Sequence, residues 1–373
     1  MLTFLLLFFA IYGGMQAIVF LKIHPILPQA RLARPALGLF MALMVLSPVL
    51  THLFDSWGRT AWAKSFGWAG YSWMGFTFLA FWLGLLLFAA EAVLWLLRRS
   101  GLLLLPSVPH KPAAWAVLLL AAGLCLYGHL QTHRLATERI ALSSPKLGTM
   151  PGFRIVQISD LHLGLLSSEQ QLGSIIERIR RLEPDLLVCT GDLVDGNLQR
   201  LRQWTPLWQD LDPPLGKFAV TGNHEYYAGL EDALDLLRGF GFRILMNERV
   251  RIHEDIALLG TEDALHNDCA LEERLLGGSE PSRFRLYLKH RPLVCTESVD
   301  LQLSGHTHKG QIFPFNLFVG LHYPFISGLH RLDNGSTLYV SRGTGTWGPR
   351  IRLGSSPEIT VIEVSAASGK AEA

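Results

Sequence analysis

The sequence predicts a chain of two parts: an N-terminal all-α transmembrane bundle and a C-terminal α/β sandwich of two mixed β-sheets flanked by helices. Two observations lead to this prediction. Four long apolar stretches fall within the first 130 of the 373 residues. From about Glu138, short apolar segments alternate with turn residues at the spacing of strands and short helices. The length also suits two domains.

The four apolar stretches are each long enough to cross a membrane, because a bilayer core about 30 Å thick needs ~20 apolar residues in a helix. Buried helices of a soluble core would instead show polar faces at helical period, and these runs show almost none. The first stretch lacks the basic start and the cleavage site of a signal peptide. The stretches run over residues 2–21, 35–54, 70–97 and 112–130.

These boundaries divide the chain into four expected segments. They are a membrane domain over 1–130, a linker and first edge strand over 131–151, a C-terminal α/β domain over 152–365 and a tail over 366–373.

Basic residues in the short loops indicate the orientation in the membrane. The first and third loops carry more of them than the second, which places those two loops in the cytoplasm and the C-terminal domain outside. Three basic residues after the fourth stretch count against this. We therefore expect a multi-pass protein of the cell (inner) membrane with an extracytoplasmic C-terminal domain. The residues in favour are Lys22, Arg31, Arg34, Arg98, Arg99 and Lys111, and those against are Arg134, Arg139 and Lys146.

Charge and cysteine content argue against two classes of protein, a basic nucleic-acid binder and a disulfide-rich domain. Residues 1–130 carry eight basic and two acidic residues, a net charge of +6, so the remainder of a chain whose total is +2 is net −4. A strongly basic nucleic-acid binder is not expected. The four cysteines show no CxxC spacing, indicate no disulfide framework and do not fix the redox compartment. Glu91, an acid inside the third stretch, is a functional candidate, although its closeness to Arg98 favours a position at the interface.

In the C-terminal part, strands alternate with helices early and follow one another later, which favours a sandwich with helices outside. Strands at 139–144 and 153–159 are joined by a turn. Helical spacing appears at 168–182 and 230–241. Further strands are expected near 184–190, 216–222, 242–247, 256–260, 283–290, 300–305, 337–343 and 358–364.

Five of these strands are followed directly by polar clusters. Ligands of α/β proteins gather at the carboxyl ends of strands, so the five ends are expected to converge on one site. Each cluster alone has a simpler interpretation, since Asp and Asn often cap turns and a single histidine often bonds locally. All five together favour a metal site, because carboxylate, amide oxygen and imidazole are the ligands that hard to borderline divalent ions take up. The clusters are DLH with Asp160 and His162, GDLVD with Asp192, GNHE with Asn223 and His224, then His290, and GHTH with His306 and His308.

The order DxH, GDxxD, GNHE, lone His and GHTH resembles the calcineurin-like metallophosphoesterases over about residues 138–365. The stretches SGHTHKGQ and RGTGTWGPRIRLGSSPEIT are more narrowly similar to the membrane-anchored bacterial branch, which includes enzymes that cleave the pyrophosphate of UDP-2,3-diacylglucosamine. The resemblance implies a dinuclear centre. One metal would take Asp160, His162 and His308, and the other Asn223, His290 and His306. Asp192 would bridge them, and His224 would be catalytic without binding metal.

The leading expectation is a membrane-bound phosphoesterase that uses two divalent ions (Mn, Fe or Zn, with Mn favoured) to hydrolyse a phosphodiester or pyrophosphate bond with a metal-activated water. A broad phosphomonoesterase on soluble esters and a catalytically idle membrane sensor or scaffold are the alternatives. The expected partners are the lipid bilayer and an amphiphilic phosphoester, with no nucleic acid.

The segment 312–330, which follows the GHTH motif, is rich in aromatic and aliphatic residues interrupted by Pro314, Gly320 and Pro324. These interruptions make a long regular helix unfavourable, so a loop or broken segment is expected. Two interpretations stay open: the segment packs into the core, or it contacts lipid.

Overall fold

The computed structural model describes residues 2–28, 31–102, 109–148, 150–263, 269–277, 282–294, 299–333 and 335–367. Most of the predicted tail, 366–373, lies outside the described residues. Contacts divide the chain into two compact units, Met1–Leu130 with Gly348–Ile351, and Gln131–Trp347 with Arg352–Ala373.

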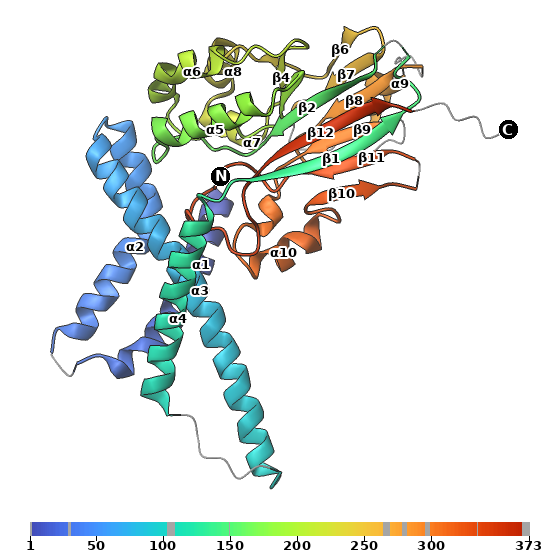
Figure 1. The fold of residues 1–373 in the computed structure, drawn as a ribbon. Coiled ribbons are helices and arrows are strands. Elements are labelled where there is room, and N and C mark those ends of the chain that lie inside the picture. The colour runs from blue at the N-terminus through green and yellow to red at the C-terminus, as the bar shows by residue number, and fades with distance from the viewer. Residues whose placement is uncertain are drawn as a thin grey trace. The chain divides into compact units, whose positions relative to one another are not determined.

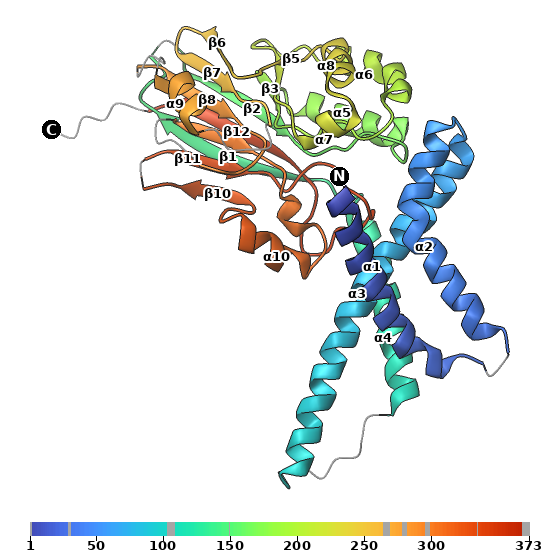
Figure 2. The same cartoon turned by 180° about the vertical axis from the view of Figure 1, so that it is seen from behind.

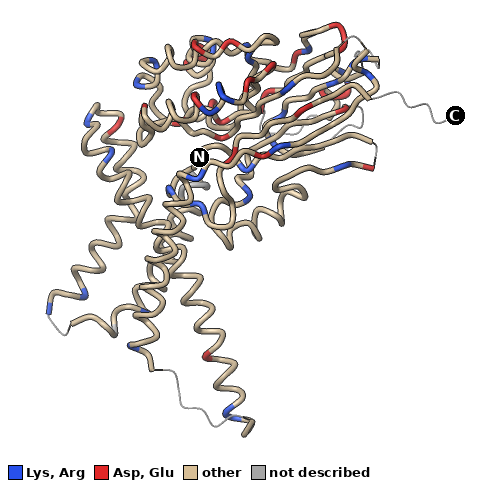
Figure 3. Tube along the Cα trace, in the orientation of Figure 1, with Lys and Arg blue, Asp and Glu red and all other residues tan. Residues whose placement is uncertain are grey.

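The first unit consists of four long helices, each apolar and long enough to cross a membrane. Figure 3 shows that charged residues are sparse along these helices and frequent in the second unit. The helices are α1 (Leu2–Ile23), α2 (Ala33–Ser56), α3 (Thr60–Arg99) and α4 (His110–Gln131), with a short 3₁₀ helix at His24–Ile26.

Helix α3 has 40 residues, which corresponds to about 60 Å at 1.5 Å per residue and so to twice the apolar thickness of a bilayer. Small residues let it approach α2 closely. A Cβ placed on Gly70 would lie 2.0 Å from Ser47 Oγ, so this contact requires glycine.

The second unit contains two six-stranded mixed sheets, which confirms the predicted fold class (Figure 1). Most neighbouring strands are parallel. The antiparallel pairs are β12 with β2, β10 with β11, and β6 with β7. The first sheet has the order β1 (Ala136–Ser144), β12 (Glu358–Ala366), β2 (Gly152–Ile158), β3 (Leu186–Cys189), β4 (Lys217–Ala219), β5 (Arg243–Ile244). The second has the order β10 (Gly328–Arg331), β11 (Thr337–Val340), β9 (Leu301–Ser304), β8 (Phe284–Leu288), β7 (Ile256–Gly260), β6 (Glu248–His253).

Side-chain alternation along the strands produces the layers of this unit. Ile155 and Val188 of the first sheet pack against Leu258 and Leu286 of the second and form the interior of the sandwich. The opposite face of the first sheet is covered by α5 (Glu169–Arg181) and α8 (Leu230–Gly239), and that of the second sheet by α9 (Cys269–Gly277). The remaining helices are α6 (Thr205–Gln209), α7 (Asn223–Ala228) and α10 (Phe315–His322), with 3₁₀ helices at Leu198–Trp204 and His308–Gly310.

Three details differ from the sequence analysis or refine it. The strands β1 and β2 follow one another along the chain but do not pair, because β12 lies between them (Figures 1 and 2). The segment 312–330 contains a short regular helix, α10, that begins after Pro314. The cysteine spacing indicated no disulfide framework, but Cys269 is disulfide-bonded, whereas Cys125 and Cys189 are free.

Candidate metal centre

The structure brings the predicted site residues together from both sheets. Each follows the carboxyl end of its strand: β2, β3 and β4 in the first sheet, and β8 and β9 in the second. The carboxylates and the amide come from the first sheet, whereas the second sheet contributes only imidazoles. The first set is Asp160, His162, Asp192, Asn223 and His224, and the second is His290, His306 and His308.

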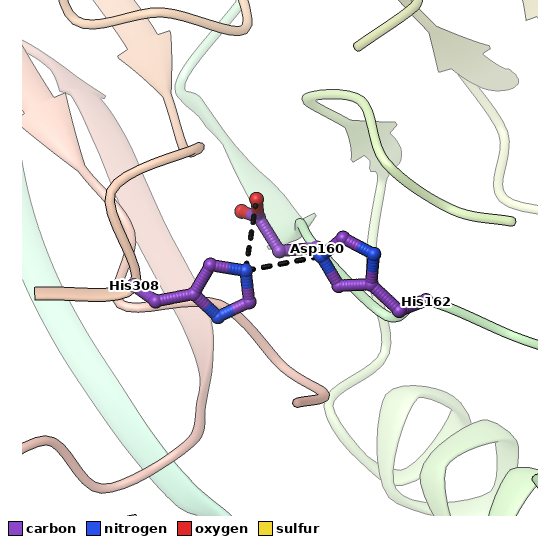
Figure 4. A group of neighbouring side chains, drawn as sticks. All are labelled: Asp160, His162 and His308. Carbon is purple, nitrogen blue, oxygen red and sulfur yellow. Dashed lines mark hydrogen bonds and ion pairs between the residues drawn. The ribbon is translucent and has the colours of Figure 1, made fainter. Parts of the chain in front are cut away.

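Asp160, His162 and His308 form the first compact group, with one ligand atom of each within 4.8 Å of the others. Figure 4 shows the three side chains pointing toward one another. The Nε2 atoms of His162 and His308 are 3.0 Å apart, and His308 Nε2 lies 3.5 Å from Asp160 Oδ1. All three residues are buried. Two nitrogens and a carboxylate oxygen thus converge on one point.

Asp192, His290 and His306 form a second group of the same kind. His306 Nδ1 lies 3.0 Å from His290 Nε2, which in turn lies 3.2 Å from Asp192 Oδ2. His290 Nδ1 is 2.7 Å from the carbonyl oxygen of Thr190 and donates to it, so that Nε2 faces the group. Asp192 Oδ2 also lies 3.9 Å from His162 Nε2 of the first group. Asp192 is therefore placed between the two groups.

Asn223 provides a direct test of whether a cation fits here. Its Oδ1 atom is buried and accepts no hydrogen bond from the described residues. A buried amide oxygen without a donor is costly, unless a cation satisfies it. The donor set of carboxylates, imidazoles and one amide oxygen suits divalent ions of the Mn, Fe or Zn type. The residues present fit two metal ions, and the assignment of each ligand to one ion stays a prediction.

The protonation of the buried groups also favours a cation. Burial lowers the pKa of His162 to about 4 and that of His306 to about 2, so both imidazoles are neutral and keep a lone pair. Burial opposes protonation of His290 too, but the charge of Asp192 and a hydrogen bond to it raise the pKa of His290 to about 10. Burial raises the pKa of Asp160 to about 6. The neutral imidazoles of His162 and His306 are therefore available as ligands.

His224 forms a third compact group with His162 and Asp192, again with one ligand atom of each within 4.8 Å of the others. Its Nδ1 atom lies 3.1 Å from Asp195 Oδ1, which leaves Nε2 to donate elsewhere. Burial opposes protonation of His224, but the hydrogen bond to Asp195 and the charge of Asp192 outweigh it, so that the pKa is raised. The rings of Tyr227 and Trp347 lie 5.3 and 6.0 Å from the His224 ring. The His224 ring is thus held in one orientation beside two aromatic rings.

The glycines of two motifs let ligands from different strands approach one another. A Cβ on Gly222 would lie 2.2 Å from Asp192 Oδ1, and one on Gly305 would lie 2.4 Å from Asp160 Oδ2. Such contacts are impossible without displacement of the ligand. Glycine therefore precedes Asn223 and His306 because the backbone at Gly222 and Gly305 lies directly against a predicted ligand of another motif.

The sequence analysis did not single out four charged residues around the site. Asp195 orients His224. Glu225 accepts hydrogen bonds from the backbone N–H groups of residues 192, 193, 194 and 222, at 2.7–3.2 Å, and so joins the GDLVD and GNHE turns. Buried Arg352 lies with Nη2 3.1 Å from His308 Nδ1. Arg291 pairs with Asp263 at 2.8 Å, and its charge is one cause of the low pKa of His306.

Only two of the four could have been found from the sequence. Asp195 and Glu225 stand inside the motifs GDLVD and GNHE. In each motif this is the charged residue to which the sequence analysis assigned no function. Nothing in the sequence connects Arg352 with His308, which lies 44 residues earlier.

Comparisons of the sequence with known proteins point to one family of metal-dependent enzymes. A profile of the family described as calcineurin-like phosphoesterase matches residues 153–310. An uncharacterized metallophosphoesterase of Aquifex aeolicus is 37% identical over 258 residues, covering 66% of this chain and 97% of that protein. An uncharacterized metallophosphoesterase of Campylobacter jejuni is 36% identical, covering 57% of this chain and 59% of that protein. A transmembrane protein with metallophosphoesterase domain of Danio rerio is 34% identical, covering 57% and 53%.

Proposed function

Because this chain belongs to the calcineurin-like phosphoesterase family and is a metal-dependent phosphoesterase, we propose that it hydrolyses a phosphodiester or pyrophosphate bond in a lipid-linked substrate. The observation behind this proposal is the convergence of two ligand groups on Asp192 in a chain that also carries four helices of membrane-spanning length. The helices favour a substrate held in the bilayer.

The ligands prepare the site for an anionic substrate. Two divalent ions, when bound, neutralise the phosphoryl oxygens and acidify water into a nucleophile at neutral pH. Asp192 suits the bridging position, because its two carboxylate oxygens can be divided between ions. Asn223 adds an oxygen without adding negative charge, which keeps the site attractive to phosphate.

His224 is the proposed general acid. The hydrogen bond to Asp195 raises the pKa of His224, which favours the protonated imidazole, and Nε2 is available because Nδ1 is occupied by Asp195. The oxygen that leaves the phosphorus needs a proton, and general acids in this role contribute on the order of 10²–10⁴-fold. Asp195 acts through His224 by holding the ring in place.

Manganese is the proposed metal in both positions. The ligands include no thiolate, and carboxylate and amide oxygens suit Mn, although imidazole binds Fe and Zn as well. Elemental analysis of protein purified without chelator, followed by reconstitution with each metal, would identify the pair. Full activity with zinc but not with manganese would contradict this choice.

The chain is a membrane protein, and we propose that it crosses the cell (inner) membrane several times with its catalytic unit outside. The basic residues of the first and third loops support this orientation. The disulfide at Cys269 adds independent support, because disulfides persist in oxidising compartments and are rare in the cytosol. The proposed partners are accordingly the bilayer and an amphiphilic phosphoester, and no nucleic acid.

A turnover panel on the purified, metal-loaded, full-length protein tests the proposal. Lipid phosphodiesters and pyrophosphate-linked lipids should be hydrolysed with a higher kcat/KM than soluble phosphomonoesters. Preference for soluble monoesters would instead indicate a broad phosphomonoesterase. Absence of turnover on all substrates, with two metals bound per chain, would contradict the proposed function altogether.

A further inference from the structure

Helix α10 presents large apolar side chains to the outside of the catalytic unit. None of its residues is buried, whereas a helix of a globular domain normally buries one face. We call the following residues the α10 surface: Phe313, Phe315, Leu317, Phe318 and Leu321, which are 53, 45, 60, 45 and 86% exposed. Packing of this segment into the core, one of the two interpretations open from the sequence, is therefore wrong for these side chains.

The two ends of the segment are held firmly, although its middle is exposed. Ile312 and Tyr323 are buried on either side of the helix. The amide of Phe313 donates to the carbonyl of Leu353 at 2.9 Å, and Thr307 Oγ1 donates to the carbonyl of Ile326 at 2.7 Å. The apolar side chains are thus displayed by an ordered segment, which lowers the entropy cost of binding a partner.

Charge around the α10 surface suits an anionic lipid surface. Residues 309–332 contain no Asp or Glu, while Lys309 and Arg331 stand near the two ends of the segment. Apolar side chains flanked by cations are the composition of elements that lie in the headgroup and acyl boundary of a bilayer. A protein partner with an acidic face would be less well matched by the three phenylalanines.

The bilayer is also a partner that lies within reach of the catalytic unit, because a short connection joins this unit to the last long helix. The last membrane-length helix ends at Gln131 and β1 begins at Ala136, so only four residues, at most ~14 Å of extended chain, join them. We propose that the α10 surface inserts into the outer boundary of the bilayer in which the long helices are embedded.

This contact would act directly on the metal centre. The ring of Tyr323, at the end of α10, lies 5.3 Å from the ring of His306. Thr307, which stands between His306 and His308, bonds to the carbonyl of Ile326 beyond the helix. Bilayer binding by α10 would therefore hold the GHTH turn near the level of the lipid headgroups. The inference deepens the proposed function by naming the element that meets the membrane, and it depends on membrane location, not on hydrolysis.

Spin-label depth measurement on the full-length protein tests it. Phe318→Cys carries the label in nanodiscs of anionic and zwitterionic phospholipids, and Arg238→Cys on α8, an exposed position, is the matched control. The unsubstituted chain corrects for labelling of Cys125. Collisions with dissolved oxygen, which partitions into lipid, should exceed those with a water-soluble nickel chelate at position 318 and not at position 238.

Two results would overturn the inference. Greater access of the nickel chelate at position 318 would mean that the α10 surface faces water. Shielding from both reagents would mean that protein covers it, whether the long helices of this chain or a second copy.

A kinetic experiment separates this inference from the proposed substrate. The double variant Phe315→Ser, Phe318→Ser should lose about tenfold or more in turnover of a phosphoester embedded in vesicles and retain turnover of a soluble chromogenic phosphoester. Leu329→Ser, an exposed apolar residue outside the α10 surface, should retain both. Equal losses on both substrates would contradict the inference. If the parent protein hydrolyses neither substrate, the proposed function fails and the depth measurement still decides the role of α10.

Discussion

At the scale of single residues, backbone strain concentrates on the predicted metal ligands. Asp160, His162, Asp192, His306 and His308 all have φ between 47° and 70°. This left-handed region is uncommon for residues other than glycine, and such positions cost of order 1–3 kcal/mol each. The surrounding structure must therefore over-determine them, and the hydrogen bonds to Asp160, Asp192 and Glu225 do so. Bound metal would further offset this cost.

Asp192→Asn is expected to lower metal binding and turnover together, by on the order of 100-fold or more. The amide has one oxygen in place of two and no charge, so it cannot serve both ligand groups. Elemental analysis and kinetics of the purified variant check this. Two ions per chain with normal activity would contradict the bridging assignment.

His224→Ala is expected to retain both metals and to reduce kcat on the order of 10²–10⁴-fold, since the side chain acts on the leaving oxygen. Metal content and kcat are measured on the same preparation. If the variant loses metal, His224 is a ligand instead, and an unchanged kcat removes it from the mechanism.

Asp195→Asn is expected to move the alkaline limb of the pH–rate profile to lower pH. The hydrogen bond to Asp195 raises the pKa of His224, so its loss lets His224 release the proton at a lower pH. Below that pH the variant should approach the rate of the parent more closely than His224→Ala does. An unmoved limb would show that Asp195 does not control the acid.

The predicted ligands could be found from the sequence for two reasons. Metal chemistry restricts the residue types that can serve as ligands, and the strand pattern shows where each strand ends. The roles of the surrounding residues could not be inferred in the same way, even where the residues stand inside the motifs. Glu225 and Asp195 needed the relative register of two turns, and Arg352 needed a contact between segments far apart in sequence. Their roles follow from tertiary geometry, which no local pattern encodes.

At the scale of elements, most strands and the long helices could be predicted from the sequence, whereas the pairing of strands with one another could not. Apolar runs bounded by Gly, Asp and Asn located the strands β2 to β5 and β7 to β9, whereas β6 was not expected. That β12 separates β1 from β2 depends on pairing across more than 200 residues. Likewise, the prolines around α10 correctly excluded a long helix, but they did not exclude eight residues of helix that begin after Pro314.

Gly70→Ala should destabilise the helical unit by roughly 1–3 kcal/mol, as overpacking does, because the new methyl group meets Ser47 of α2. Gly84→Ala is the matched control on the same helix, where nothing lies within 4 Å of the added Cβ. That variant should keep or gain stability, since alanine favours helices. Thermal unfolding in detergent compares the two, and equal midpoints would contradict the close contact between α2 and α3.

At the scale of the whole molecule, the side of the membrane decides which substrates the enzyme can meet. Asp210→Cys introduces a thiol at an exposed position of the catalytic unit, whereas Cys189 is buried and Cys269 is disulfide-bonded. We expect an impermeant thiol reagent to label this variant on intact cells, with the unsubstituted chain as background. Labelling only after lysis would reverse the proposed orientation.

The position of β12 has a consequence for how the chain is made. All seven predicted ligands are translated by His308, but the strand that fills the gap between β1 and β2 is translated only at residues 358–366. Until then β2, which leads into Asp160 and His162, has an open edge that invites misassembly of the nascent chain. A ribosome that stops after the GHTH motif would therefore release a product with every predicted ligand in its sequence but with β2 lacking one of its two neighbouring strands. We therefore expect activity to require residues 358–366, although none of them is a predicted ligand.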